Sequence, residues 1–204
     1  MPLGHGTFLR RALRRPDLMG APAPTGAALA AEIAAVVPDV GTPTVVELGA
    51  GTGALSDAIH ARLAPGSRYV AVEVDAEFVA YLHRTRPWLE VLHGDAADLT
   101  TLLAAAGVGT VDAIISSLPW TLLPPAQRHS MLTAAAGTLG RDGVFATIIT
   151  LTAIPDRVRD LVRCMEDRFT HVEATTPVWR NLPPARLYVC RGPRHAALRA
   201  DEAS

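Results

Sequence analysis

The sequence predicts an α/β fold built on a doubly wound, mostly parallel sheet, and three observations support that prediction. The chain has 204 residues, of which 49% are hydrophobic and 19% charged, which suits one domain with a sizeable core. Strand-like and helix-like segments alternate after residue 42, and the first strand-like run ends in a glycine-rich loop. Such alternation is typical of parallel strands joined by right-handed helical crossovers.

The individual elements follow from hydrophobic periodicity and from the positions of glycine and proline. Short apolar runs predict seven strands, at residues 44–48, 69–74, 89–93, 111–116, 144–151, 171–176 and 186–190. The segments between them predict helices at residues 54–63, 76–84, 125–139 and 156–169. This domain is placed at residues 41–192. Before it we expect N-terminal helices in residues 1–40, at 7–15 and 25–37, and after it a flexible tail at 193–204.

Composition limits the cellular setting and the class of partner. All 19 basic residues are Arg and the net charge is −1, so the chain lacks a global positive field that would hold a polyanion. Its apolar stretches are interrupted well before the roughly 18 residues that cross a bilayer, and no signal peptide is recognisable. Two cysteines are too few for a disulfide scaffold. We therefore expect a cytoplasmic protein.

The strongest local motif is the run V-V-E-L-G-A-G-T-G-A-L at residues 45–55, where a predicted strand leads into Gly49, Gly51 and Gly53 and then into a helix. Glycines permit positive φ and let a ligand approach the backbone beside a helix N-terminus. The spacing differs from the dehydrogenase fingerprint G-x-G-x-x-G, and an acid, Glu47, precedes the loop. A glycine turn without a ligand is the alternative interpretation.

Two acidic residues follow the next two predicted strands. Glu73 lies at the end of the second strand, where a carboxylate can accept hydrogen bonds from ribose hydroxyls; Asp75, two residues later, is the alternative. Asp95 follows the third strand in H-G-D-A and can accept a hydrogen bond from an exocyclic amine. Because the carboxyl ends of parallel strands meet at one edge, the loop and both acids are predicted to share a site.

These three motifs together resemble the class I S-adenosylmethionine-dependent methyltransferases, over most of residues 40–190. The resemblance implies a Rossmann-like seven-stranded sheet with S-adenosyl-L-methionine as the cofactor. It also implies a cofactor site that includes Glu47, Gly49, Gly51, Gly53, Glu73, Asp95, Ala96 and Ser116.

The segment S-S-L-P-W at residues 116–120 follows the fourth predicted strand, where the methyl acceptor usually lies in that fold. It resembles the N/D-P-P-Y motif of amino-methylating enzymes, with Ser117 and Trp120 as the predicted catalytic pair. The serine hydroxyl can hold a neutral amine, and a Trp face can stabilise the cationic product by about 0.5–2 kcal/mol. Alternatively, Trp120 is a core or pocket-wall aromatic. Ser117 suits an adenine base edge poorly, and with no Lys in the chain we predict no nucleic-acid partner.

The N-terminal helix predicted at residues 7–15 divides into an apolar and a basic face. Such a helix can lie in a membrane interface with its apolar face down, held reversibly by the attraction of the arginines to anionic lipids. It can equally pack on the protein's own domain with its basic face in solvent. The residues predicted to contact the membrane are Phe8, Leu9, Arg10, Arg11, Leu13, Arg14 and Arg15.

The block V-W-R-N-L-P-P-A-R at residues 178–186 lies between the last two predicted strands. We predict that Trp179, Arg180, Asn181 and Arg186 bind the substrate, because Arg is a natural phosphate ligand. The motifs R-R-P-D-L-M-G, V-E-L-G-A-G-T-G, H-G-D-A-A-D-L, S-S-L-P-W and W-R-N-L-P-P-A, in this order, resemble the bacterial phosphatidylethanolamine N-methyltransferases from about residue 7 to 191. The S-L-P-W segment departs from that family, in which a Gly and an aliphatic residue more often flank Leu-Pro.

The sequence therefore predicts an S-adenosylmethionine-dependent N-methyltransferase that modifies a phospholipid amine head group of the phosphatidylethanolamine type at the membrane surface. In that family the basic N-terminal helix is a membrane-binding element. A soluble methyltransferase for a small amine is the alternative enzyme, and an inactive cofactor- or lipid-binding module is the alternative from another class. An rRNA adenine N-methyltransferase ranks below them. No cluster of His, Cys and acidic residues has the spacing of metal ligands, so no metal is predicted.

Overall fold

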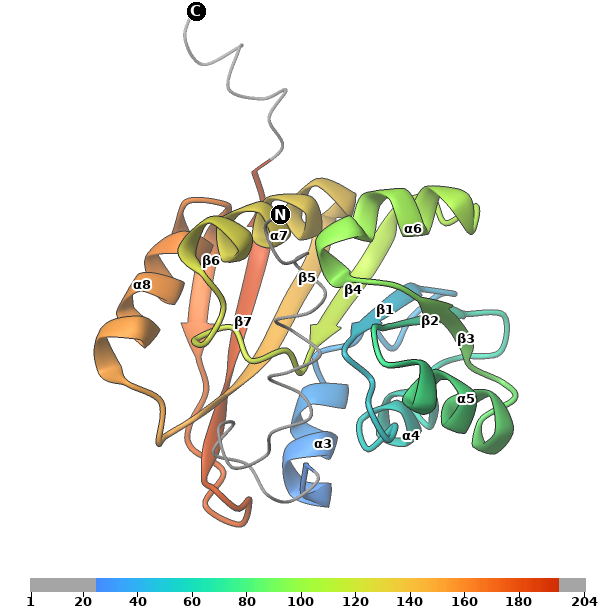
Figure 1. Cartoon of the computed structure of the whole chain (residues 1–204), viewed down its shortest axis with the longest axis horizontal. Coiled ribbons are helices and arrows are strands. Elements are labelled where there is room, and N and C mark those ends of the chain that lie inside the picture. Colours follow the sequence, from blue (N-terminus) through green and yellow to red (C-terminus); the bar gives the residue numbers. More distant parts are fainter. Residues whose placement is uncertain (1–24, 195–204) are drawn as a thin grey trace, which may run out of the picture.

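A seven-stranded sheet forms the centre of the protein in a computed structural model, which describes residues 25–194 (Figure 1). The strands lie in the order β3-β2-β1-β4-β5-β7-β6. β7 runs antiparallel to both of its neighbours, and the other neighbouring pairs are parallel. The strands are β1 (Thr44–Leu48), β2 (Arg68–Glu73), β3 (Glu90–His93), β4 (Val111–Ser116), β5 (Leu139–Thr150), β6 (Phe169–Ala174) and β7 (Ala185–Pro193).

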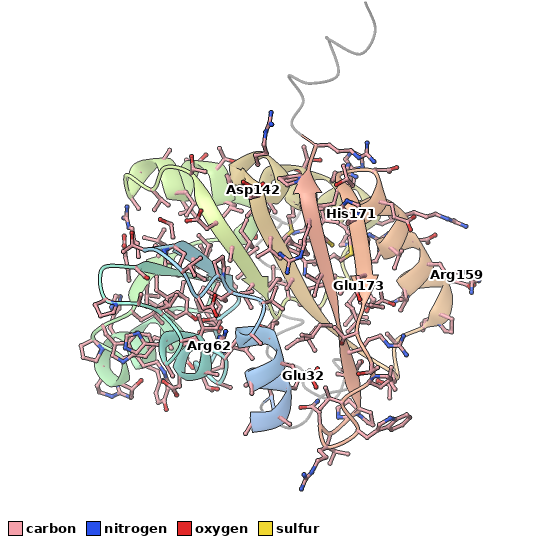
Figure 2. The ribbon with its side chains drawn as sticks, turned by 180° about the vertical axis from the view of Figure 1, so that it is seen from behind. Glu32, Arg62, Asp142, Arg159, His171 and Glu173 are labelled. Atoms are coloured by element: carbon pink, nitrogen blue, oxygen red, sulfur yellow. The ribbon has the colours of Figure 1, made fainter. Side chains whose placement is uncertain are left out.

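Helices cover both faces of this sheet. One face packs against α3 (Ala27–Ala34), α4 (Ser56–His60) and α5 (Ala76–Thr85), and is in front when the molecule is seen from behind (Figure 2). The other packs against α6 (Leu99–Ala105), α7 (Pro125–Thr138) and α8 (Pro155–Glu166). A short 3-10 helix, η1 (Ala96–Asp98), precedes α6. Because both faces are covered, the central strands bury residues on both sides: Val45 and Val46, whose side chains point to opposite faces, are both fully buried.

The predicted fold class is confirmed, and the differences lie in the bounds of some strands and in the helices: β5 begins at Leu139, five residues before its predicted start. The predicted helix at residues 25–37 is limited to Ala27–Ala34, and α6 was not predicted at all. The α6 segment has only seven residues, two of them Thr, and its amphipathic signal is two buried leucines, Leu99 and Leu103, one turn apart. The predicted helix at residues 7–15 and nearly all of the predicted tail lie outside the described residues. Within the described residues, no helix is long and apolar enough to cross a membrane.

The strand order alone indicates where a ligand crevice lies, without reference to any side chain. β1 and β4 are neighbours at the centre of the sheet. The chain leaves β1 toward β2 on one side and leaves β4 toward β5 on the other side. At such a switch point the loops after the strands separate and leave a crevice at their carboxyl ends. The glycine loop follows β1 and the S-S-L-P-W segment follows β4, so both border that crevice.

Candidate active site

The glycine loop joins β1 to α4 and takes a backbone path that requires glycine. Gly49, Gly51 and Gly53 have φ values of 77°, 54° and 77°. A Cβ atom added to Gly49 would lie 2.7 Å from Cδ2 of Leu118, whereas one added to Gly51 would have no heavy atom within 4 Å. Gly49 is therefore needed for packing against the loop after β4, and Gly51 faces open space that a ligand can enter.

Glu73 is the last residue of β2, and its carboxylate lies against the glycine loop. Oε2 accepts a hydrogen bond from the Gly51 N–H at 2.8 Å, and Oε1 accepts one from the Asp75 N–H at 2.9 Å. A carboxylate offers about four acceptor positions, so about two are left for ribose hydroxyls. Asp75, the alternative ribose ligand, instead caps α5 by accepting a hydrogen bond from the Glu77 N–H. The geometry favours Glu73 over Asp75.

Glu47 lies beneath the loop, completely buried between β1, β2 and α4. Its Oε2 accepts hydrogen bonds from Ser56 Oγ and from the Tyr69 hydroxyl, both at 2.6 Å, and its Oε1 has no partner. Burial raises the pKa of this carboxyl, and the hydrogen bonds from Ser56 and Tyr69 oppose that shift only in part. These contacts give Glu47 a supporting position under the loop, and a direct contact with the cofactor stays a prediction.

The end of β3 is tied to the end of β2, as the sequence predicted for adjacent strands. Glu73 pairs with His93, and the Gly94 N–H donates to the Glu73 carbonyl at 3.0 Å. Asp95 then caps η1, its Oδ1 accepting a hydrogen bond from the Ala97 N–H at 2.9 Å, and Ala96 is buried in the first position of that helix. The half-buried Asp95 carboxylate therefore lies on the same edge as Glu73 and the glycine loop.

The two serines after β4 have different surroundings. Ser117 Oγ donates a 2.5 Å hydrogen bond to the Gly49 carbonyl, which joins the segment after β4 to the glycine loop. Ser116 is buried, and its Oγ accepts a hydrogen bond from Trp120 Nε1 at 2.9 Å. Ser116 thus positions the Trp120 ring, and Ser117 lies between the glycine loop and the cavity described next.

Trp120 differs from its predicted role. Its side chain is fully buried, and its ring meets the edge of Phe145 with the centroids 5.6 Å apart. A ring without exposed surface presents no face to an amine, so the predicted cation–π contact does not fit this structure. The alternative interpretation, an aromatic of the core and the pocket wall, agrees with the burial of Trp120.

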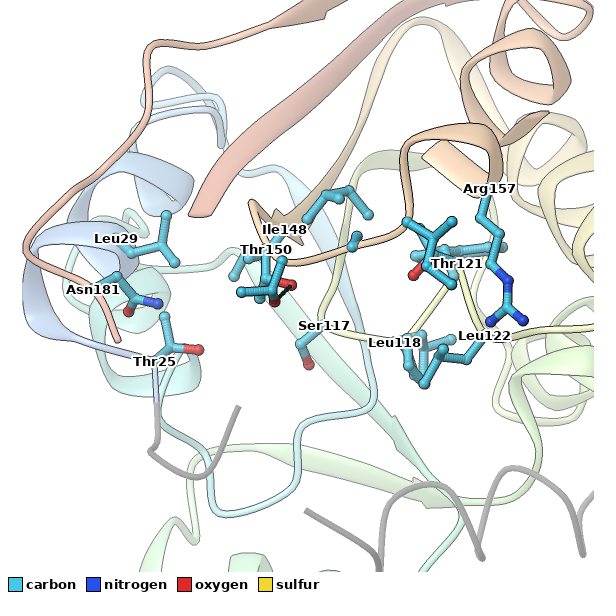
Figure 3. Close-up of a pocket in the computed structure, with 16 residues that line it drawn as sticks. Thr25, Leu29, Ser117, Leu118, Thr121, Leu122, Ile148, Thr150, Arg157 and Asn181 are labelled. Atoms are coloured by element: carbon cyan, nitrogen blue, oxygen red, sulfur yellow. Dashed lines mark hydrogen bonds between the residues drawn. The ribbon is translucent and has the colours of Figure 1, made fainter. Parts of the chain in front are cut away.

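A cavity of about 310 Å³ opens at the carboxyl ends of β4 and β5, beside Ser117 (Figure 3). Its walls come from residues 117–122, 148–150 and 152–154, from Thr25 and Leu29 before and on α3, from Arg157 on α8, and from Asn181. Figure 3 shows Arg157 near Leu118 and Leu122 at one end, and Asn181 near Thr25 at the other. Arg157 is the one charged side chain among the described residues that line the cavity, and no acid lines it.

Of the four predicted substrate ligands, Asn181 alone lines this cavity. Its Oδ1 accepts a hydrogen bond from the Gly26 N–H at 2.8 Å, and its Nδ2 donates one to the Pro183 carbonyl at 2.7 Å. Trp179 and Arg180 are exposed, and Arg186 is half-buried on β7 with its Nε buried and without a partner. The prediction missed Arg157, Thr25 and the loop after β5, because nothing in their local sequence marks them as cavity walls.

The fold and this arrangement of loop and carboxylates are those of a class I methyltransferase, whose cofactor is a nucleoside derivative. A family model described as a methyltransferase domain matches residues 45–143. The chain belongs to the class I S-adenosylmethionine-dependent methyltransferases, and S-adenosyl-L-methionine is its methyl donor.

Particular proteins resemble the chain to different extents. An ornithine lipid N-methyltransferase from Singulisphaera acidiphila is 30% identical over 188 residues, which cover 91% of this chain and 94% of that protein. A ribosomal RNA small subunit methyltransferase A from Burkholderia ambifaria is 39% identical over 95 residues, covering 45% of this chain and 35% of the relative. The fold is similar to Aeropyrum pernix fibrillarin, solved with natively bound S-adenosyl-L-methionine (TM-score 0.57, 17% identity, covering 76% of this chain and 68% of fibrillarin).

The residues present fit this cofactor. Open space in front of Gly51 admits the ligand, and the Glu73 carboxylate retains acceptor capacity beside it. When bound, S-adenosylmethionine supplies a methyl group on a sulfonium, which is already activated for transfer. The protein's task is then to orient the donor and the acceptor and to exclude water from between them.

Proposed function

We propose that this methyltransferase N-methylates the primary amine of a lipid head group of the phosphatidylethanolamine type at a membrane surface. The observation that carries the proposal is the cavity lined by Ser117, which is hydrogen-bonded to the glycine loop; among the described residues its lining has one cationic side chain and no acid. A head group with an amine and an anion suits this lining, since the anion can reach Arg157 while the amine approaches Ser117. The similarity to a lipid N-methyltransferase over nearly the whole chain supports a lipid amine as the acceptor.

In this mechanism the chain binds and aligns the two reactants. Glu73 and Asp95 orient the donor, Gly51 lets it approach the backbone, and Ser117 fixes the distance between the glycine loop and the acceptor. The amine must be neutral to attack, and the described residues that line the cavity include no carboxylate that would stabilise its protonated form. Held in line by these residues, the donor would supply its methyl group to the amine lone pair; an N–C bond would form as the S–C bond breaks, with an N-methylated ammonium and S-adenosylhomocysteine as the products.

Two kinds of lipid head group fit this proposal, because both combine a primary amine with an anion. Phosphatidylethanolamine combines its amine with a phosphate, and an ornithine head group combines its amine with a carboxylate. Arg forks bind both anions, since phosphate and carboxylate oxygens accept the same parallel hydrogen bonds. The phosphatidylethanolamine assignment rests on the sequence motifs, and the similarity to the Singulisphaera protein favours the ornithine lipid.

The test is a radiolabelled methyl-transfer assay with separate acceptors: vesicles containing phosphatidylethanolamine, vesicles containing ornithine lipid, soluble ethanolamine, and 16S rRNA. We expect label in one or both lipids, and little in ethanolamine or RNA. Label in ethanolamine alone would support the soluble enzyme instead. Label in RNA would support the function of the Burkholderia relative, and no label in any acceptor would support an inactive module.

The proposed location is peripheral, on the cytoplasmic side of a membrane. The predicted basic helix at residues 7–15 is the first contact in this proposal, and it lies outside the described residues. The described part of the chain begins at Thr25, whose side chain lines the cavity, so the N-terminal segment joins the domain beside the acceptor site. Liposome co-sedimentation of the full chain and of a chain lacking residues 1–20 tests this contact, which is overturned if both bind equally.

A further inference from the structure

Four exposed apolar side chains lie on two adjoining loops, both of which form part of the wall of the acceptor cavity. Leu151 and Ile154 follow β5 and are 38% and 52% exposed, and Trp179 and Leu182 lie between β6 and β7 and are 71% and 72% exposed. We call these four residues the apolar rim. The crossing from β6 to β7 extends beyond the carboxyl ends of the parallel strands (Figure 1), so the rim projects from that end of the molecule.

Backbone pairing holds the two loops of the apolar rim together. Ala185 pairs with Thr150 of β5 and, through an isolated bridge, with Val178, which makes residues 179–184 the tip of a hairpin. The Leu151 N–H donates to the Pro184 carbonyl at 2.8 Å. Two separate segments are therefore fixed as one surface. Ile154 belongs to both this surface and the cavity wall, so the surface continues into the cavity.

The charges around the apolar rim favour an anionic partner. The segment from residue 175 to residue 186 contains Arg180 and Arg186 and no acid. Arg157 adds a third cation at the cavity, and the neighbouring acid, Asp156, forms an ion pair with Arg159. Exposed Trp and Leu side chains beside Arg are the combination that enters the interface of an anionic bilayer, since Trp favours the head-group level.

We propose that the apolar rim is a second membrane contact, separate from the N-terminal segment, which inserts into the head-group region of an anionic bilayer and turns the cavity mouth toward the lipid. This inference rests on the proposed lipid function. It assigns to Trp179 and Arg180 a contact with the bilayer surface rather than with the acceptor inside the cavity. An amine head group can then enter the cavity while its acyl chains stay in the bilayer.

The first experiment measures binding of the full chain to vesicles of phosphatidylethanolamine and phosphatidylglycerol by co-sedimentation. Leu182→Asp removes an apolar contact and adds a charge that anionic lipid repels, so we expect affinity to fall about tenfold or more. Val40→Asp is the matched control, because Val40 is 79% exposed and precedes β1 at the opposite end of the sheet. The inference is overturned if Leu182→Asp binds like the wild type or if Val40→Asp loses as much affinity.

A second measurement, tryptophan fluorescence quenching, reports insertion into the bilayer and does not depend on the stability of the fold. Brominated lipids quench tryptophan fluorescence at short range, and Trp179 is the most exposed of the three tryptophans. We expect strong quenching of the wild type and at least a twofold smaller quench in Trp179→Phe, whose remaining tryptophans are Trp88 and Trp120. Equal quenching would contradict insertion. Light scattering without lipid separates another occupant: a dimer that Leu182→Asp dissociates would make the rim a contact between copies of this chain.

These readouts separate failure of the inference from failure of the proposed function. Vesicle binding needs no methyl transfer, so rim-dependent binding without lipid methylation would leave the contact standing and remove the proposed reaction. Conversely, methylation of a short-chain, water-soluble amine lipid, with no effect of Leu182→Asp on vesicle binding, would keep the reaction and overturn the contact.

Discussion

The cofactor half and the acceptor half of the site are built in different ways. The cofactor half lies at the ends of β1, β2 and β3, and its residues come from one stretch, 47–96, joined by short hydrogen bonds to buried carboxylates. The acceptor half lies at the ends of β4, β5 and β7, and collects residues from 25 to 181 into a cavity with mostly apolar walls and an exposed apolar rim. The cofactor half depends on buried carboxylates, and the acceptor half depends on the shape of the cavity and on exposed apolar side chains.

This difference has a physical origin. A nucleotide-type cofactor has polar groups at fixed positions, so its site needs preorganised acceptors and a backbone that the ligand can approach. The proposed acceptor, a lipid, keeps its acyl chains in the bilayer, so a site for it needs an opening at the membrane side and few polar groups. Substitutions in the two halves are therefore expected to change different quantities: donor affinity in the first, and acceptor or vesicle affinity in the second.

The largest effect is expected from Glu73→Gln. The substitution removes the charge and places an amide NH₂ against the N–H of Gly51 or Asp75, so two charge-assisted hydrogen bonds and the ribose contacts weaken together. The ribose contacts exist only in the donor-bound protein, and a hydrogen bond to a charged group contributes about 1.5–3 kcal/mol, so we expect calorimetry to show S-adenosylmethionine affinity lower by a factor of about 100. Glu166→Gln on α8, an exposed position, is the control. Unchanged affinity in Glu73→Gln would mean that the ribose carboxylate is misplaced.

Gly49→Ala is expected to lower the free energy of unfolding by about 1–3 kcal/mol, because the new Cβ combines a φ of 77° with a 2.7 Å contact to Leu118. Gly51→Ala is the matched control, because Gly51 has a φ of 54° and no atom near the added Cβ. It should lose less unfolding free energy than Gly49→Ala, but it should bind the donor more weakly than the wild type. Urea denaturation measures both. In the double variant with Leu118→Ala the two effects should not add. Equal destabilisation at Gly49 and Gly51 would contradict the packing argument.

Asn181→Ala tests the acceptor half. The change removes the hydrogen bonds to Gly26 and Pro183, which join the start of α3 to the hairpin tip, and should destabilise the fold by about 1–2 kcal/mol. Because neither bond touches the glycine loop, S-adenosylmethionine affinity should stay at the wild-type value while the KM for the acceptor rises. A parallel loss of donor affinity would show that the two halves are not separable.

The smallest effect concerns Glu47, and it depends on pH. Burial raises the pKa of Glu47, so between the unfolded pKa of about 4.5 and the higher folded value the native state binds more protons than the unfolded state. The free energy of unfolding of the wild type should therefore fall as pH rises through that window, by about 1.4 kcal/mol for each unit of the shift. Glu47→Gln lacks this titration. Its stability relative to the wild type, from urea midpoints, should rise with pH; a constant difference would argue against a raised pKa.

Most of the sheet and the cofactor half could be predicted from the sequence, because the signals are local. A buried strand such as Thr44–Leu48 is a continuous apolar run, and three glycines after it, with Glu73 after the next strand, leave few interpretations. The acceptor cavity could not be predicted, since Thr25, Arg157 and Asn181 come together only through the fold.

The burial of aromatic residues near strand ends could not be predicted from the sequence either. Trp120 was predicted to face the acceptor and is buried, whereas Trp179 was predicted to line the substrate site and is exposed at the apolar rim. Both residues follow a strand and neighbour a proline or an arginine, and periodicity does not distinguish a core position from a surface one over so few residues. Burial is decided by what packs from elsewhere in the chain, here Phe145 against Trp120.

The most direct test of the division into two halves is steady-state methyl transfer to amine lipid in vesicles, with donor and vesicle concentrations varied independently. We expect wild-type protein to methylate the lipid. Glu73→Gln should raise the KM for S-adenosylmethionine and leave the dependence on vesicle concentration unchanged. Leu182→Asp should raise the vesicle concentration needed for half-maximal rate and leave the KM for S-adenosylmethionine unchanged. The account would be contradicted if the wild type methylated no lipid, or if both variants changed the same constant.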